Sequence, residues 1–279
     1  VPKMTDMLTS TSITLGEAYM NGDIEIEGDL YTALNMFLGQ MGKFSTDKKK
    51  LKNIIFTSKS MANQKKEVSS HYDIGNDFYK MWLDETLSYS CGYFKNDNDT
   101  LYQAQCNKVD RILEKLNLSE NMTLCDIGCG WGFLLIEAAK KYKIKGVGIT
   151  LSKEQKAKFE QRIKDEGLSE RLEVKLLDYR DLPKLNKKFD RVVSVGMIEH
   201  VGRGNYEEFM QCVKSVLKPG GIFVLHFISA LKEYPGDAWV KKYIFPGGVI
   251  PSLREIIQIA GEQRFYTVDV ESLRRHYNR

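Results

Sequence analysis

Two short stretches carry residues whose types and spacing could do chemistry. The first is SYSCGYF, residues 88–94, in which Cys91 sits among hydroxyl groups and aromatic rings, shortly after the run HYDIGNDFYKMWLDE. Its thiol could be a nucleophile, a metal ligand, a group with a less usual role, or a small buried apolar group, which is the usual state of a free cysteine. This stretch alone does not decide between these roles.

The second stretch is CDIGCGWG, at the point where an apolar segment ends and a helical pattern begins. Its special residues are Asp126, Gly128, Gly130 and Gly132. A dinucleotide site would need G-x-G-x-x-G and an acid about 20 residues later, but the spacing here is G-x-G-x-G and Thr150 stands at that distance. The missing G-K-[ST] excludes a phosphate loop. The pattern resembles the first motif of S-adenosylmethionine methyltransferases, and a plain strand–helix turn that needs glycine is the alternative.

The elements that must position these residues follow from the hydrophobic pattern. From about residue 120, short apolar runs alternate with amphipathic segments, which predicts a doubly wound α/β fold with a parallel sheet and helices on both faces. Ligands of such sheets bind at the carboxyl ends of the strands. We expect strands at 121–128, 145–152, 172–179, 189–200 and 221–229, and helices at 131–142, 153–168 and 205–221.

The segment before this sheet changes character along its length. Residues 1–42 carry six acids and one base, and their best helix is expected at 25–37. Residues 43–66 carry eight lysines and one acid, interleaved with apolar side chains. This basic run could lie on an anionic membrane surface or be a solvated linker, and both readings stay open. Residues 69–110 are rich in aromatic side chains and are expected to be helical or looped.

Composition excludes several classes of protein. The 279 residues are 42% hydrophobic and 28% charged, which is ordinary for a globular protein. Five cysteines without a C-x-x-C pair predict neither a disulfide framework nor a metal site, and we expect a reducing cytoplasm. There is no membrane-spanning apolar run, and the first residues lack the layout of a signal peptide. The net charge of +4, without a recognisable binding motif, argues against a nucleic-acid partner.

Several long stretches resemble cyclopropane fatty acid synthases and their mycolic-acid relatives. They are HYDIGNDFYKMWLDETLSYSCGYF, CDIGCGWG, GITLSKEQ, VGMIEHVG, YIFPGG with IPSLREI, and VESLRRHY, with a weaker likeness in LGEAYMNGDIEIEGDL. The resemblance implies a Rossmann-like methyltransferase fold, with a mostly parallel sheet of seven strands, a helical lead-in and a small N-terminal segment. It divides the chain into a partial lipid-associating and dimerisation segment with a basic linker, 1–68, and an S-adenosylmethionine-dependent catalytic domain, 69–279.

The resemblance also implies which residues contact the cofactor S-adenosylmethionine. Thr150, Leu151 and Gln155 replace the missing acid after the second strand. DYRD resembles the segment that holds the adenine, so Tyr179 and Arg180 are its expected contacts, with Asp178 a further candidate. The other expected contacts are Tyr89, Ser90, Asp126, Gly128 and Gly130.

The chemistry of such an enzyme sets further demands. An alkene is a poor nucleophile, so it must be oriented against the electrophilic methyl group of the sulfonium. A base must then remove a proton from the new methyl group so that the ring closes, in a pocket dry enough to protect the carbocation. The resemblance implies that the base is a bound bicarbonate ion. Its expected contacts are Cys91, Glu199, His226, the backbone of Ile228, and Tyr277.

Each of these side chains has a structural alternative. Cys91 and His226 could be core residues, and Glu199 could simply close the strand expected at 189–200. His200 is expected to point away from Glu199, because neighbours alternate along a strand. His226 would donate to the ion and Glu199 would accept its O–H.

The resemblance extends to partners. It implies an unsaturated phospholipid substrate, peripheral contact with the inner membrane surface, and a homodimer formed through the lead-in. The apolar loop IFPGGVIPS, residues 244–252, could cover the lipid tail or be an ordinary turn. Family members continue past the RRHY stretch, so we expect this sequence to be part of a longer protein. Two other classes stay open: a methyltransferase that branches lipids or methylates small-molecule amines, and a non-catalytic cofactor-binding module.

Overall fold

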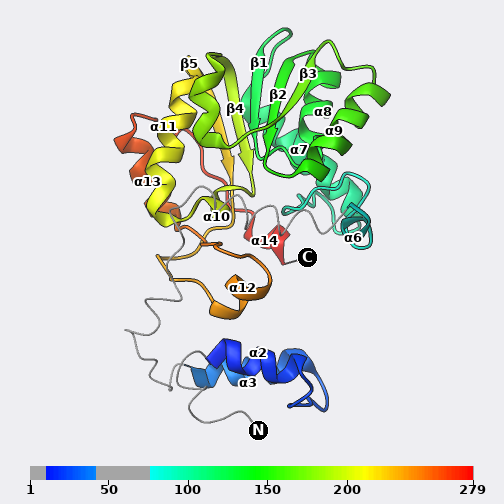
Figure 1. Cartoon of the computed structure of the whole chain (residues 1–279), viewed down its shortest axis with the longest axis vertical. Helices are drawn as coiled ribbons and strands as arrows, with labels where there is room; N and C mark the ends of the chain where they lie inside the picture. Colours follow the sequence, from blue (N-terminus) through cyan, green and yellow to red (C-terminus); the bar gives the residue numbers. More distant parts are fainter. Residues whose placement is uncertain (1–10, 42–75, 279) are drawn as a thin grey trace.

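A parallel sheet forms the centre of the molecule. The computed structural model describes residues 11–41 and 76–278 (Figure 1). The strands of this part of the chain are β1 (Thr123–Ile127), β2 (Lys145–Thr150), β3 (Leu172–Leu176), β4 (Phe189–Val195) and β5 (Leu217–His226). Their order is β3-β2-β1-β4-β5, and each neighbouring pair is parallel. The chain therefore reverses its winding direction between β1 and β4, and this reversal is where ligands of such sheets bind. The predicted doubly wound α/β fold is confirmed.

Helices surround the sheet and extend the chain on both sides of it. In the described residues they are α2 (Thr11–Met20), α3 (Leu30–Met41), α6 (Asn76–Lys80), α7 (Leu101–Leu116), α8 (Phe133–Tyr142), α9 (Lys153–Asp165), α10 (Ile198–Val201), α11 (Tyr206–Val216), α12 (Ala238–Tyr243), α13 (Leu253–Glu262) and α14 (Arg274–Tyr277). Two segments are 3-10 helices, η1 (Tyr179–Leu185) and η2 (Arg203–Asn205).

Two hydrophobic cores hold these helices against the two faces of the sheet. Helices α7, α8 and α9 cover one face, where Leu113, Leu135 and Phe159 are fully buried (Figure 1). Helices α11 and α13 lie on the other face with η1, where Phe209 and Leu182 are buried. The buried positions of α7 and α11 recur at three- and four-residue spacing, as amphipathic helices require.

Several predicted boundaries are wrong, and two of them bear on the site. The helix predicted at 205–221 ends at Val216, because Leu217 already pairs with Phe189 and begins β5. The strand predicted at 189–200 ends at Val195. Gly196 then takes a φ of +61°, which turns the chain, and the short helix α10 follows. Gly167, predicted to end a helix, does follow the end of α9, with a φ of +66°.

The N-terminal helix α2 lies beside α12, which belongs to the segment after β5 (Figure 1). Lys242 and Tyr243 of α12 both donate to a carboxylate oxygen of Glu17. Gly16 packs against Trp239 so closely that a Cβ atom would lie 2.3 Å from its indole nitrogen. The helix predicted at 25–37 is observed as α3, whereas α2 was not predicted. The basic run 43–66 lies outside the described residues. Within the described chain, no helix combines the length and apolar character needed to cross a membrane.

Candidate active site

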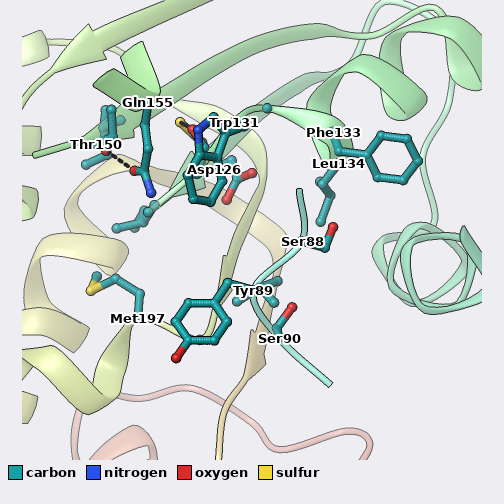
Figure 2. Close-up of a pocket in the computed structure, with 18 of the residues that line it drawn as sticks. Ser88, Tyr89, Ser90, Asp126, Trp131, Phe133, Leu134, Thr150, Gln155 and Met197 are labelled. Carbon is teal, nitrogen blue, oxygen red and sulfur yellow. Dashed lines mark hydrogen bonds between the residues drawn. The ribbon is translucent and has the colours of Figure 1, made fainter. Parts of the chain in front are cut away.

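A pocket with a volume of about 150 Å³ opens at the carboxyl ends of β1 and β2 (Figure 2). It collects nearly all of the side chains predicted to contact the cofactor. Its lining includes Tyr89, Ser90, Asp126, Gly128, Gly130, Thr150, Leu151, Gln155 and Tyr179. Residues from four separate parts of the chain thus meet where the fold predicts a ligand.

The glycine turn between β1 and α8 has a backbone that only glycine tolerates easily. Gly128, Gly130 and Gly132 have φ angles of +81°, +54° and +85°. A Cβ atom on Gly132 would lie 2.0 Å from the ring of Phe159, whereas one on Gly130 would meet no atom within 4 Å. The glycines therefore serve two purposes. Gly132 lets the turn pack against α9, and Gly130 leaves open space where a ligand can approach the backbone.

The end of β2 fixes the orientation of a carboxamide in the pocket. The Thr150 hydroxyl donates to Oε1 of Gln155 at 2.6 Å, as Figure 2 shows by a dashed line. Ser152 caps α9 by accepting the backbone N–H of Gln155 at 3.2 Å. Because the carboxamide oxygen is held by Thr150, its nitrogen is the group that can donate to a ligand.

Of the two residues of the DYRD segment that were predicted to contact the adenine, only one lines the pocket. Tyr179 lines the pocket, and among the described residues its buried hydroxyl has no hydrogen-bond partner. Arg180 does not line it. Its guanidinium instead donates two hydrogen bonds to Asp178, at 2.8 and 2.7 Å, and lies over the Tyr179 ring. Arg180 therefore holds η1 in place, while Tyr179 is the group that can contact a ligand.

Aromatic rings hold the lead-in segment over the mouth of the pocket. Tyr79, Trp82 and Trp131 pack together, and Tyr79 is fully buried. Tyr89 packs edge-on against Trp82 at 4.9 Å between ring centroids and stacks on Phe245 at 6.2 Å. Phe245 belongs to the apolar loop 244–252, so this loop does approach the pocket, as one of its two predicted roles requires.

The predicted ion-binding residues lie outside the pocket lining, in a second group of contacts. Oε1 of Glu199 accepts the backbone N–H of Ile228 at 2.7 Å. Oε2 is buried and has no hydrogen-bond partner among the described residues. Burial raises the pKa of Glu199, since the charged form loses its hydration. Glu199 thus lies on α10, not at a strand end as predicted, and it is already in contact with the predicted backbone group.

His226, Cys91 and Tyr277 complete this second group. Burial, together with the charge of Lys108, lowers the pKa of His226 to about 4, so its imidazole is neutral near pH 7. The Cys91 thiol donates to the carbonyl of Gly92 at 3.3 Å, and burial raises its pKa. Tyr277 is 60% exposed, but partial burial still raises its pKa, and Cys91 and Glu199 add to the rise, so each of these two side chains lies within electrostatic range of Tyr277.

Two basic side chains of the pocket lining were missed by sequence reasoning. His200 lines the pocket. The prediction that it points away from Glu199 relied on strand alternation, which does not apply because both residues lie on α10. Lys108 also lines the pocket and is only 4% exposed. The sequence does carry a signal for the burial of Lys108, which is its position on the apolar face of the α7 segment together with Ala104 and Val109.

Comparison with known proteins decides the family. The family model described as mycolic acid cyclopropane synthetase matches residues 59–279. The chain belongs to this family. A second model, for a domain of unknown function, matches residues 2–49.

Similar proteins agree with this family. The cyclopropane-fatty-acyl-phospholipid synthase of Escherichia coli (strain K12) is 39% identical over 98% of this chain and 70% of its own length. A probable fatty acid methyltransferase of Pseudomonas putida is 39% identical over 99% of this chain and 71% of its own length. The crystal structure of mycolic acid cyclopropane synthase CmaA1 complexed with SAH and CTAB has a TM-score of 0.71 and 34% identity, and covers 76% of this chain and 79% of that one.

These findings confirm the predicted fold and enzyme class. The chain has the Rossmann-like fold of S-adenosylmethionine methyltransferases and is an enzyme of this class, within the cyclopropane synthase family. Among the described residues, no cluster of histidine, cysteine and acidic side chains could hold a metal ion.

The buried carboxyl group of Asp126 predicts a pH dependence of cofactor binding. Burial raises its pKa to about 7, and the nearby Lys108 opposes this rise. We expect Asp126 to pair with the ammonium group of the cofactor, and below pH 7 the carboxyl group becomes protonated and would lose this pairing. We therefore expect the affinity for S-adenosylhomocysteine to fall by up to about tenfold per pH unit as the pH drops from about 7 to 5.5.

Isothermal titration calorimetry at several pH values checks this expectation. The variant Asp126→Asn, which cannot ionise, should bind weakly and lose the dependence over the same range. Asp165→Asn is a matched control on the exposed end of α9 and should behave like the unmodified protein. A pH-independent affinity in the unmodified protein would contradict the assignment of Asp126.

Proposed function

We propose that this protein is a cyclopropane-fatty-acyl-phospholipid synthase that works with S-adenosylmethionine and a bound bicarbonate ion. The observation that carries the proposal is the buried Oε2 of Glu199, which has no hydrogen-bond partner among the described residues. A buried acceptor without a partner is costly, so a donor that binds there would be stabilised. The O–H of bicarbonate is such a donor, and the neutral His226 offers an N–H to the other side of the ion.

The chain's own residues would prepare the cofactor and the lipid. When bound, S-adenosylmethionine supplies an electrophilic methyl group and bicarbonate supplies a base. Asp126 would pair with the ammonium group of the cofactor, and Gln155 would donate from a carboxamide fixed by Thr150. Tyr89 and Phe245 would exclude water from the space between cofactor and lipid, since their rings stack over the pocket.

The bicarbonate site would be built from uncharged donors and one acidic side chain. Cys91 and Tyr277 lie within electrostatic range of each other and of the ion's expected position beside Glu199. The N–H of Ile228 already donates to Glu199, so its role would be to orient that carboxylate. Because burial raises the pKa of Glu199, this group can share a proton with the ion and avoid repulsion between two bare charges.

Exposed apolar side chains support contact with a lipid surface. Helices α2 and α3 carry the exposed side chains Tyr19, Met20, Leu30, Tyr31, Leu34 and Met36. Together with the basic run 43–66 they would suit peripheral binding to anionic lipid at the inner membrane surface. We also propose that the protein forms a homodimer through the N-terminal segment 1–68.

A second candidate function is methyl branching of a lipid chain. The Pseudomonas putida relative, named a probable fatty acid methyltransferase, favours it because it matches 99% of this chain at 39% identity. Both reactions would begin with methyl transfer to the alkene, and they differ in whether the ring closes. Methylation of a small-molecule amine would use the same cofactor pocket with a different acceptor.

The substrate class is tested with vesicles. We expect unsaturated phosphatidylethanolamine or phosphatidylglycerol vesicles, incubated with S-adenosylmethionine and the protein, to gain one CH2 per modified acyl chain by mass spectrometry. Saturated vesicles are the matched control and should gain no mass, because they lack the alkene. Mass gained on the head group, or on an added amine but on no lipid, would refute the phospholipid assignment.

A further inference from the structure

A buried lysine lines the cofactor pocket and is not used by the proposed mechanism. Lys108 lies on the inward face of α7 and is 4% exposed. Its ammonium donates to the hydroxyl of Ser90 at 2.9 Å, and both residues line the pocket together with Asp126. A lysine in this position needs a reason, because side chains of this type are almost never fully buried unless they are paired.

The described protein groups around Lys108 do not neutralise it by direct contact. Within the described residues its ammonium makes one hydrogen bond, to a neutral hydroxyl, so two of its three N–H donors remain for a ligand. The acids that interact with it at longer range are Asp84 and Asp126, besides the thiols of Cys91 and Cys106. Asp84 is already engaged with the backbone and hydroxyl of Thr86. A buried cation in this situation favours an anion that enters with the ligand.

The pocket presents one charge of each sign at the glycine turn. Asp126 ends β1 with a buried carboxyl group, and Lys108 faces the same pocket from α7. The amino-acid end of S-adenosylmethionine is a zwitterion, with an ammonium and a carboxylate on one carbon atom. An opposite pair of protein charges matches such an end, and a charge-assisted hydrogen bond to each is stronger than a neutral one.

Helix α7, which carries Lys108, also fixes the backbone of the neighbouring lead-in segment around Ser90. Gln105, one turn earlier on α7, donates its carboxamide to the carbonyl oxygens of Ser88 and Ser90, at 3.3 and 2.9 Å. Further along the segment, the N–H of Tyr93 donates to the carbonyl of Ala104. Helix α7 therefore holds both Ser90 and Lys108 in a set position before any ligand arrives, which lowers the cost of ordering them on binding.

We propose that Lys108, together with the hydroxyl of Ser90, binds the carboxylate of the amino-acid end of S-adenosylmethionine, opposite Asp126. This inference rests on the proposed function only in taking S-adenosylmethionine as the cofactor. The proposed bicarbonate ion is the other anion nearby. The cofactor is favoured because Lys108 and Ser90 line the pocket, whereas Cys91, Glu199 and His226 do not.

Two ligands that differ at the amino-acid end separate this role from a structural one. S-Adenosylhomocysteine carries the carboxylate, and 5′-methylthioadenosine has the same adenosine but no amino-acid end. By calorimetry, Lys108→Met should bind S-adenosylhomocysteine about 10- to 100-fold more weakly and 5′-methylthioadenosine within about twofold of the unmodified protein. Lys108→Arg keeps the charge and should recover part of the loss. Lys164→Met, at an exposed position on α9, is the matched control and should change neither affinity.

The outcomes that would overturn the inference are distinct. Unchanged binding of S-adenosylhomocysteine by Lys108→Met overturns it, and a raised KM for bicarbonate in that case assigns the lysine to the other anion. If the variant loses both ligands because it does not fold, the unmodified protein decides with the carboxyl methyl ester of S-adenosylhomocysteine. An ester that binds as tightly as the parent overturns the proposal, and one that binds at least tenfold more weakly supports it. Both experiments measure ligand binding, so their results do not depend on whether the protein forms the cyclopropane ring.

Discussion

Glu199→Gln is expected to lower the rate of ring formation by about 100- to 10,000-fold while leaving cofactor affinity within about twofold. The substitution keeps the shape of the side chain, and its amide oxygen can still accept the N–H of Ile228. It replaces the buried Oε2, which has no partner among the described residues, by an NH2 group that cannot accept the O–H of an ion. The rate is measured from modified acyl chains, and the affinity by calorimetry with S-adenosylhomocysteine.

Stability provides the control for this variant. Because burial raises the pKa of Glu199, the charged form destabilises the fold at high pH, and a neutral glutamine removes that penalty. The variant should therefore unfold in urea no more easily than the unmodified protein at pH 8. Glu170→Gln, at an exposed position before β3, should leave both rate and stability unchanged. A Glu199→Gln enzyme with more than a third of the normal rate would remove Glu199 from the mechanism.

Gly132→Ala is expected to destabilise the protein by about 4 kcal/mol, from a strained backbone and an overpacked core together. Gly132 has a φ of +85°, and an added Cβ atom would lie 2.0 Å from the ring of Phe159, which is fully buried and cannot move aside cheaply. Gly130→Ala is the matched variant, because its φ is also positive but its Cβ atom would meet no neighbour within 4 Å. It should cost only about 1 kcal/mol of stability.

Urea unfolding of the two variants measures this difference. We expect Gly132→Ala to reach the midpoint of unfolding at a clearly lower urea concentration than Gly130→Ala. In the matched variant the added methyl group faces the pocket, so we expect weaker binding of S-adenosylhomocysteine with little loss of stability. Equal losses of stability in the two variants would mean that the packing of Phe159 against the turn is not as described.

The centre of the sheet could be predicted from the sequence because β1, β2 and β4 are buried on both faces. Such strands appear as short continuous apolar runs, bounded here by the glycine turn at Gly128 and by polar segments. The apolar character of buried strands also explains why the end of β4 was predicted five residues too late. The run FDRVVSVGMIEH stays apolar beyond Val195, so local pattern could not show that Gly196 turns the chain into α10.

The end of α11 could not be predicted for a related reason. Leu217 and Lys218 continue the helical pattern, but the pairing of Leu217 with Phe189 draws them into β5. This contact joins residues far apart in the sequence, and no local propensity records it. The helix predicted at 205–221 therefore ends earlier than expected, at Val216.

The part of the candidate site that matches motifs of the family could be predicted from the sequence. The residues outside these motifs could not, because only the folded chain brings them to the pocket. The predicted cofactor residues meet in one pocket except for Arg180, whose partner Asp178 lies two residues before it. Lys108 escaped notice because a lysine in an amphipathic helix usually faces solvent. Its burial follows from the way α7 packs over the lead-in segment, which only the folded chain shows.

The most direct test of the central claim follows the methyl group itself. Unsaturated phospholipid vesicles would be incubated with S-adenosylmethionine whose methyl group carries three deuterium atoms, in buffer with bicarbonate and in buffer depleted of it. The account predicts acyl chains that gain one carbon with two deuterium atoms, resist ozonolysis because the double bond has become a ring, and form only when bicarbonate is present. Chains that keep all three deuterium atoms or remain cleavable by ozone, or equal yields without bicarbonate, would contradict it.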